Sequence, residues 1–85
     1  MSGRPPTVRI QLLSNARFTF LCLGVVTQQR LAPRIDRLGS NPVPEDARRL
    51  AGTNHVYRAC WEGVRVLYHY RAGRITILEF KQDAS

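Results

Sequence analysis

Two short turns in the C-terminal third of the sequence constrain its fold more than any other feature. Glu62-Gly63 and Ala72-Gly73 separate three runs that are rich in β-branched and aromatic residues. Two loop residues with glycine in second place are typical of the tight primed turns that join antiparallel strands. The sequence therefore predicts a three-stranded antiparallel meander. Its strands are expected at Val56–Trp61, Val64–Tyr70 and Ile75–Phe80.

The first of these turns also predicts which side chains share a face of the meander. With Glu62 and Gly63 as loop residues, Trp61 lies opposite Val64, and the pairs that follow are Cys60 with Arg65, Ala59 with Val66, and Arg58 with Leu67. Side chains alternate between faces along a strand, so one face is apolar and is expected to bury. This apolar face comprises Tyr57, Ala59, Trp61, Val64, Val66, Tyr68, Tyr70, Ile75 and Ile77. The opposite, mixed face comprises Val56, Arg58, Cys60, Arg65, Leu67, His69, Thr76, Leu78 and Phe80.

The N-terminal half begins with a second strand signal. Residues 7–13 alternate apolar and polar side chains, which predicts a half-buried strand. Ser14 and Asn15 are expected to end this strand and to cap a helix. The next segment, 18–26, leaves two interpretations open from its own residues. It is rich in β-formers and its propensity favours a strand that ends at Gly24, whereas a helix would bring the following residues near one face: Ala16, Phe20, Leu23 and Thr27.

A helix is predicted more clearly after this segment. Leu31, Ile35 and Leu38 follow one another at helical spacing, and Gly39 with Asn41-Pro42 is expected to end the helix. Pro33 is expected either to open this helix at its first turn or to kink it. Residues 40–54 hold two prolines and little periodicity, which predicts a connecting loop, with one short turn at 47–50.

The size and composition predict a single domain that spans residues 1–85, with residues 1–6 frayed. Cys22 and Cys60 are far apart in a chain without a secretory signal, which indicates reduced thiols and a cytoplasmic protein. The apolar stretch 18–26 is too short to cross a bilayer. A core of this size is marginal, so a protein partner is expected.

The excess of positive charge is typical of a protein that binds nucleic acid. Thirteen Lys and Arg residues stand against six Asp and Glu residues, for a formal net charge of +7, and all but one of the cations are arginine. Arginine binds phosphate through two N–H groups and stacks on bases, although a GC-rich genome that favours arginine codons, or an acidic protein partner, would also account for the bias. Arg58 and Arg65 repel each other on neighbouring strands unless an anion lies between them. A phosphate would fit that position.

Other kinds of site have little support. The two cysteines and two histidines lack metal-ligand spacing, so no metal is expected. No phosphate loop, dinucleotide-binding turn or serine or cysteine nucleophile motif is present, so no cofactor is expected. His69, on the mixed face, is a candidate acid or base near neutral pH. The tyrosines are expected to pack in the core or at its rim.

Four segments, in this order, resemble the RelE/ParE toxin superfamily. They are Ile35-Asp-Arg-Leu-Gly-Ser-Asn-Pro42, Ala47-Arg-Arg-Leu-Ala-Gly52, Val56-Tyr-Arg58 and Gly63-Val-Arg-Val-Leu-Tyr68. They are similar to that family's helix end, loop and central hairpin, and cover about half the chain. The resemblance implies an α+β fold with an N-terminal strand and two helices packed on an antiparallel sheet that ends in the meander. Residues 18–26 are then helical.

The resemblance also implies roles for particular residues. Arg65 would hold the scissile phosphate of an RNA and stabilise the transition state, assisted by Arg58. The candidate RNA-binding residues also include Arg48, Arg49 and Lys81. Cys60 stands where a second basic residue is common in the family. Active relatives continue past the last strand with an arginine and often a tyrosine or histidine, whereas this chain stops at Lys81–Ser85. Either His69 or Lys81 is then the candidate to replace the usual acid–base group.

The short connection between the helices favours the RelE-like branch, which implies a metal-independent endonuclease that cuts messenger RNA on the ribosome and inhibits translation. The implied partners are a cognate antitoxin, the ribosome and mRNA. Two alternatives stay open: a non-catalytic, ParE-like inhibitor of DNA gyrase, and an inactive toxin-fold protein that binds only its antitoxin. Exposed apolar residues such as Phe18, Leu21 and Phe80 are candidates for the antitoxin interface.

Overall fold

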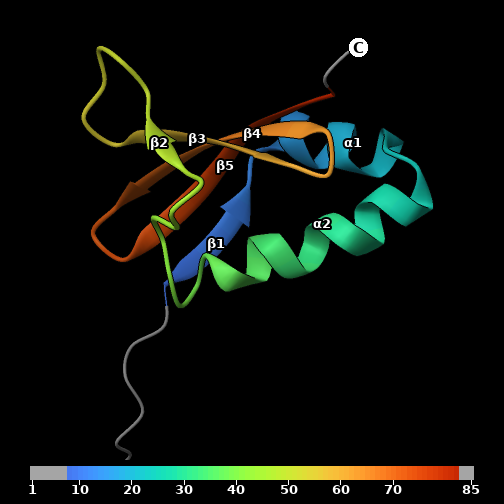
Figure 1. The fold of residues 1–85 in the computed structure, drawn as a ribbon, viewed down its shortest axis with the longest axis horizontal. Helices are drawn as coiled ribbons and strands as arrows, with labels where there is room; N and C mark the ends of the chain where they lie inside the picture. The colour runs from blue at the N-terminus through green and yellow to red at the C-terminus, as the bar shows by residue number, and fades with distance from the viewer. Residues whose placement is uncertain (1–7, 83–85) are drawn as a thin grey trace, which may run out of the picture.

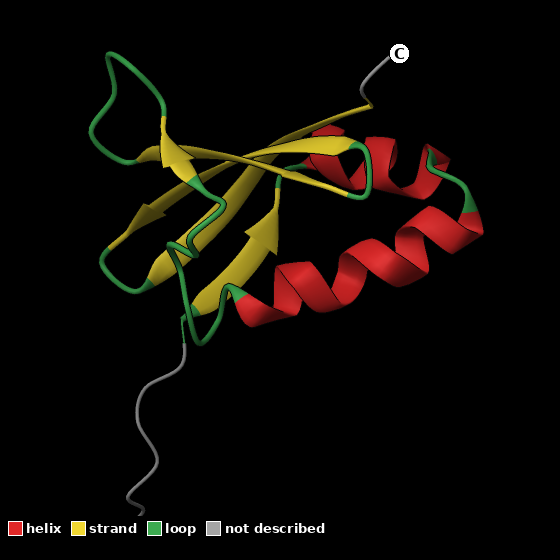
Figure 2. Cartoon of the chain, in the orientation of Figure 1, coloured by secondary structure: helices red, strands yellow, loops and turns green. Residues whose placement is uncertain are grey.

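A computed structural model describes residues 8–82, where five strands form one mixed sheet in the order β1-β5-β4-β3-β2. Both helices lie on the same side of this sheet (Figures 1 and 2). The expected α+β arrangement is therefore confirmed, while the expectation for residues 1–6 lies outside the described part of the chain. The strands are β1 Arg9–Leu12, β2 Arg48–Arg49, β3 Val56–Trp61, β4 Val64–Arg71 and β5 Arg74–Gln82, and the helices are α1 Ser14–Cys22 and α2 Val25–Arg37.

The meander has the predicted register at its first turn. Trp61 pairs with Val64 and Arg58 with Leu67. Both residues of each turn have positive φ angles, 54° and 75° at Glu62-Gly63 and 53° and 74° at Ala72-Gly73. Positive φ at both central residues is the hallmark of the type I′ turn, whose twist matches that of the strands. The sheet departs from an all-antiparallel arrangement at its edge, because β1 runs parallel to β5.

A β-bulge reverses the alternation of β5 near its end. Leu67 pairs with Glu79 but Tyr68 pairs with Ile77, which leaves Leu78 as the extra residue. A bulge inserts one unpaired residue into a strand and so exchanges the faces of those that follow. Phe80 is therefore only 3% exposed, on the core side, and the prediction that it lies on the mixed face and contributes to an exposed interface is wrong.

The bulge is held by α1. The ring of Phe80 packs against that of Phe20 with centroids 5.4 Å apart. The Asn15 side-chain amide donates a hydrogen bond of 3.2 Å to the carbonyl oxygen of Leu78. Asn15 therefore bonds to the sheet and does not cap its own helix. The cap position is occupied by Leu13 without a side-chain hydrogen bond, so the predicted cap is wrong.

The apolar face of the meander packs under the helices as predicted. Its side chains are buried, apart from Tyr57 and Tyr70, which are half-buried. The helical interpretation of 18–26 holds except at Leu23 and Gly24, since α1 ends at Cys22 and α2 begins at Val25. Pro33 lies inside α2, so it does not open the helix. The helical segments contribute Ala16, Leu23, Leu31, Ile35 and Leu38 to the core.

The connection between α2 and β3 is tied to the core by two polar contacts. The Trp61 indole donates a hydrogen bond of 2.8 Å to Asp46, which also lies 3.8 Å from the Arg34 guanidinium. The buried Tyr68 hydroxyl donates a bond of 2.7 Å to the Pro42 carbonyl. Residues 48–49 form the edge strand β2 against β3, so the predicted short turn at 47–50 is wrong. This pairing adds arginines to the sheet.

Candidate functional site

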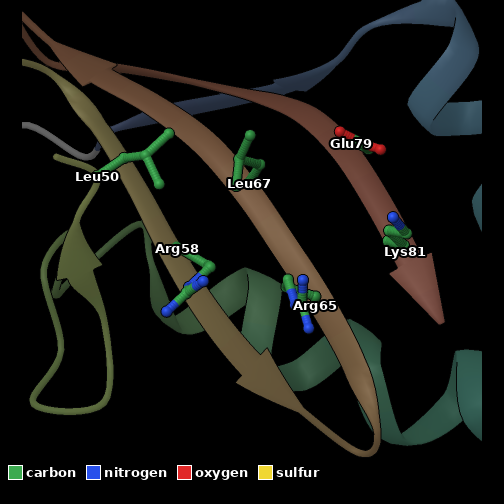
Figure 3. Close-up of a pocket in the computed structure, with 6 residues that line it drawn as sticks. All are labelled: Leu50, Arg58, Arg65, Leu67, Glu79 and Lys81. Carbon is green, nitrogen blue, oxygen red and sulfur yellow. The ribbon is translucent and has the colours of Figure 1, made fainter. Parts of the chain in front are cut away.

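A shallow hollow of about 280 Å³ opens on the mixed face of the sheet, away from the helices (Figure 3). The central strands β3, β4 and β5 supply most of its walls, and one residue comes from the segment that follows β2. Three of the lining side chains carry positive charge. The lining residues are Leu50, Arg58, Arg65, Leu67, Glu79 and Lys81.

Strand pairing brings the cations together. Arg65 lies opposite Lys81 on β5, and Arg58 lies opposite Arg48 on β2. Arg58 and Arg65 are diagonal neighbours, a relation that places Cβ atoms about 7 Å apart. Among the described residues, neither Arg58 nor Lys81 forms an ion pair. Like charges on facing strands are destabilising without a counter-charge, so this arrangement favours an anionic ligand.

Glu79 is the functional candidate that sequence reasoning missed. Regular alternation would place it on the core side with Ile75 and Ile77, but the bulge turns it and Lys81 onto the mixed face. The spacing of apolar residues carries the signal, because Ile75 and Ile77 are two apart whereas Phe80 follows after three. Glu79 makes no ion pair within residues 8–82 and is the one carboxylate that lines this hollow.

The structure does not bring His69 to the hollow that holds Arg58 and Arg65. His69 instead borders a second hollow nearer the other end of β4, where its ring lies 5.7 Å from that of His55 in an edge-on arrangement. Arg48 and Arg49 lie on different faces of the sheet. Arg48 shares the mixed face with its partner Arg58, whereas Arg49 pairs with Tyr57 and alternation places it on the core side.

Tyr68 lies under the sheet and is structural. Burial raises the pKa of its phenol, and nearby Tyr57 and Asp46 act in the same direction. Its ring stacks on Tyr57 with centroids 5.6 Å apart. No three His, Cys, Asp or Glu side chains within residues 8–82 gather into a group that could hold a metal ion. No helix in this part of the chain is long and apolar enough to span a membrane.

Comparison with known proteins gives a consistent structural family. No family model and no curated protein sequence matches the chain. Among solved structures, the archaeal RelE–RelB complex from Pyrococcus horikoshii OT3 is similar, with 28% identity, a TM-score of 0.77 and coverage of 89% of this chain and 94% of that one. The isolated E. coli RelE toxin has 15% identity, a TM-score of 0.80 and coverage of 92% and 86%.

The ParE branch has a similar fold as well. The chromosomal ParDE system of P. aeruginosa contains a chain with 11% identity, a TM-score of 0.72 and coverage of 94% of this chain and 100% of its own length. These likenesses extend over nearly the whole described fold. They therefore extend well beyond the four segments that carry the sequence resemblance, which cover about half the chain.

Proposed function

Because the chain belongs to the RelE/ParE toxin superfamily, we propose that it is the toxin of a type II toxin–antitoxin system and cleaves messenger RNA on the ribosome. The observation that carries this proposal is the hollow in which Arg58, Arg65 and Lys81 converge on an uncovered sheet face. A phosphodiester and its transition state are anionic, and fixed cations that surround them lower the barrier to attack. The proposed location is the cytoplasm, where ribosomes are found.

The residues of the hollow suffice for an in-line transfer within the RNA. Arg65 and Arg58 bind the non-bridging oxygens of the scissile phosphate. Glu79 accepts the proton of the ribose 2′-hydroxyl as its oxygen forms a bond to phosphorus, and the Lys81 ammonium donates a proton to the 5′-oxygen as its bond to phosphorus breaks. The products are a 2′,3′-cyclic phosphate and a 5′-hydroxyl. Leu50 and Leu67 complete the lining of the hollow.

An antitoxin is the expected partner, as in the RelE–RelB complex. A small acidic protein that binds this basic chain would cover its exposed apolar and charged surface and prevent access to RNA. The apolar side chains available for that contact are Phe18, Leu21, Val25 and Val26, which are all more than half exposed at the junction of α1 and α2.

The test is to induce the chain in cells without its antitoxin and to map mRNA ends and DNA breaks. We expect cuts in phase with codons inside translated regions, and their frequency should fall by about 10²–10³-fold in Arg65→Ala. Intact messages accompanied by gyrase-linked DNA breaks would replace this proposal with inhibition of gyrase. Normal growth with a soluble, folded chain would replace it with an inactive toxin fold that binds only its antitoxin.

A further inference from the structure

A row of three arginines crosses the sheet at the opposite end of β4 from the hollow just described. Arg71 and Arg74 are directly paired across the Ala72-Gly73 turn, and Arg74 is in register with Arg9 on the neighbouring parallel strand. All three side chains are exposed. Residues in register on adjacent strands share a face, so the three guanidinium groups project from the mixed face.

This arginine row has no internal compensation. No carboxylate lines the second hollow, whose walls are Gln11, His69, Arg71, Ala72, Arg74 and Thr76. Within residues 8–82, no carboxylate lies within ion-pairing distance of Arg9, Arg71 or Arg74. Like charges placed directly opposite each other destabilise a sheet. A bound anion between the guanidinium groups would offset this repulsion.

The second hollow is larger than the first, at about 440 Å³, and all but one of its lining residues have polar side chains. The Gln11 side-chain amide donates a hydrogen bond of 3.4 Å to the Thr76 hydroxyl, and His69 lies edge-on to His55. Amide, hydroxyl and imidazole groups beside guanidinium groups are the side chains that commonly contact sugar and phosphate oxygens, and a histidine ring also offers a surface on which a base can stack.

The two hollows lie on one continuous face. Arg65, Leu67, His69 and Arg71 occupy alternate positions along β4 and point to the same side. Arg71 lies six positions along β4 from Arg65, a distance of about 20 Å at roughly 3.3 Å per residue. Stacked nucleotides advance about 3.4 Å each, so a single strand of about six nucleotides spans the interval.

We infer that the row of Arg9, Arg71 and Arg74 is a second phosphate-binding subsite, which holds the backbone of the same RNA strand several nucleotides away from the bond that is cut. This inference rests on the proposed function, because it requires that the first hollow bind RNA. The subsite contributes affinity and fixes the direction of the strand across the sheet. Leu67 and His69 lie beneath the nucleotides between the two subsites.

The test compares two RNAs with 2′-O-methyl groups, which lack the attacking hydroxyl: a dinucleotide and a single strand of about ten nucleotides. Binding to the purified full chain is measured by fluorescence anisotropy over a range of salt concentrations. For Arg71→Gln/Arg74→Gln, we expect the affinity for the long RNA to fall about tenfold. The slope of log affinity against log salt should decrease by about 1.4 for two lost contacts, and dinucleotide binding should be unchanged.

The matched control is Arg30→Gln/Arg37→Gln, which removes the same charge from exposed positions of α2 on the other side of the sheet. Equal losses in both double variants would overturn the subsite, because they would reflect net charge alone. Undiminished long-RNA binding in Arg71→Gln/Arg74→Gln, with a loss in Arg58→Gln/Arg65→Gln, would overturn the subsite and leave the proposed function intact. Binding of neither RNA by the unmodified chain would rule out both the subsite and the proposed function.

Thermal unfolding verifies that each variant folds, and the Arg71→Gln/Arg74→Gln variant should be no less stable than the unmodified chain.

Discussion

The two faces of the sheet differ in what their side chains contribute. On the helix-covered face, Trp61, Val66 and Tyr68 are buried. The Trp61 indole donates a hydrogen bond to Asp46, and the Tyr68 hydroxyl donates one to the Pro42 carbonyl. On the open face, arginines stand opposite cations or hydrophobic residues, without a carboxylate opposite them. Burial of apolar area stabilises the first face, whereas the second combines charges in a way that costs stability. This difference shows that the first face holds the fold together, and it supports the proposal that the second binds an anionic ligand.

Phe80 gives the largest expected effect, because the bulge moves it from the open face to the core. Phe80→Ala should lower the free energy of unfolding by about 4 kcal/mol through lost burial and the cavity left beside Phe20. Urea denaturation followed by circular dichroism measures this change. Leu78→Ala, at the half-buried bulge residue, should cost less. A loss below about 1 kcal/mol in Phe80→Ala would show that β5 continues its regular alternation and that Glu79 faces the core.

The bulge also marks how far sequence reasoning could go. The glycine turns predicted the pairing of β3 with β4, and thereby placed Arg58 and Arg65 on one face. Local patterns carry no information on which distant strand pairs with which, so the parallel partner of β1 and the edge strand β2 could not be predicted. The helical conformation of 18–22 also ran against local propensity and depends on packing against the sheet. At the site, Lys81 was predicted, whereas Glu79 was missed, and His69, which was predicted to share the site of Arg58 and Arg65, borders a different hollow.

Glu79 tests whether the open face performs catalysis as well as binding. Glu79→Gln should reduce the rate of RNA cleavage on ribosome complexes about a hundredfold, because the amide cannot accept the 2′-hydroxyl proton. Binding of RNA should be retained or strengthened, since the substitution removes a negative charge beside the phosphate. Single-turnover cleavage and anisotropy measure the two quantities. Glu45→Gln, at an exposed position in the connection, is the matched control. A parallel loss of binding and cleavage would instead assign Glu79 a structural role.

Tyr68 tests the polar anchoring of the covered face. Tyr68→Phe removes the hydrogen bond to Pro42 and should lower the free energy of unfolding by about 1 kcal/mol. Because burial raises the pKa of this phenol above its ordinary value of 10.0, its contribution is fully present below pH 10 and is lost as pH rises above that value. Denaturation at neutral and alkaline pH should show a loss of stability that Tyr68→Phe lacks. Tyr70→Phe, at the half-buried rim, is the control, and an identical alkaline loss in Tyr68→Phe would rule out this origin.

The outer side of the helices is a third surface, which belongs to neither face of the sheet. Phe18 and Leu21 on α1 are 70% and 64% exposed, so burial within this chain does not explain their apolar character. Phe18→Ser/Leu21→Ser should change the free energy of unfolding by no more than about 0.5 kcal/mol. The same variant should weaken binding of the proposed antitoxin partner by about tenfold, as measured by calorimetry, if these residues anchor that contact. Unchanged antitoxin affinity would place the contact elsewhere, and the basic open face would then be the surface that an acidic antitoxin must cover to prevent RNA binding.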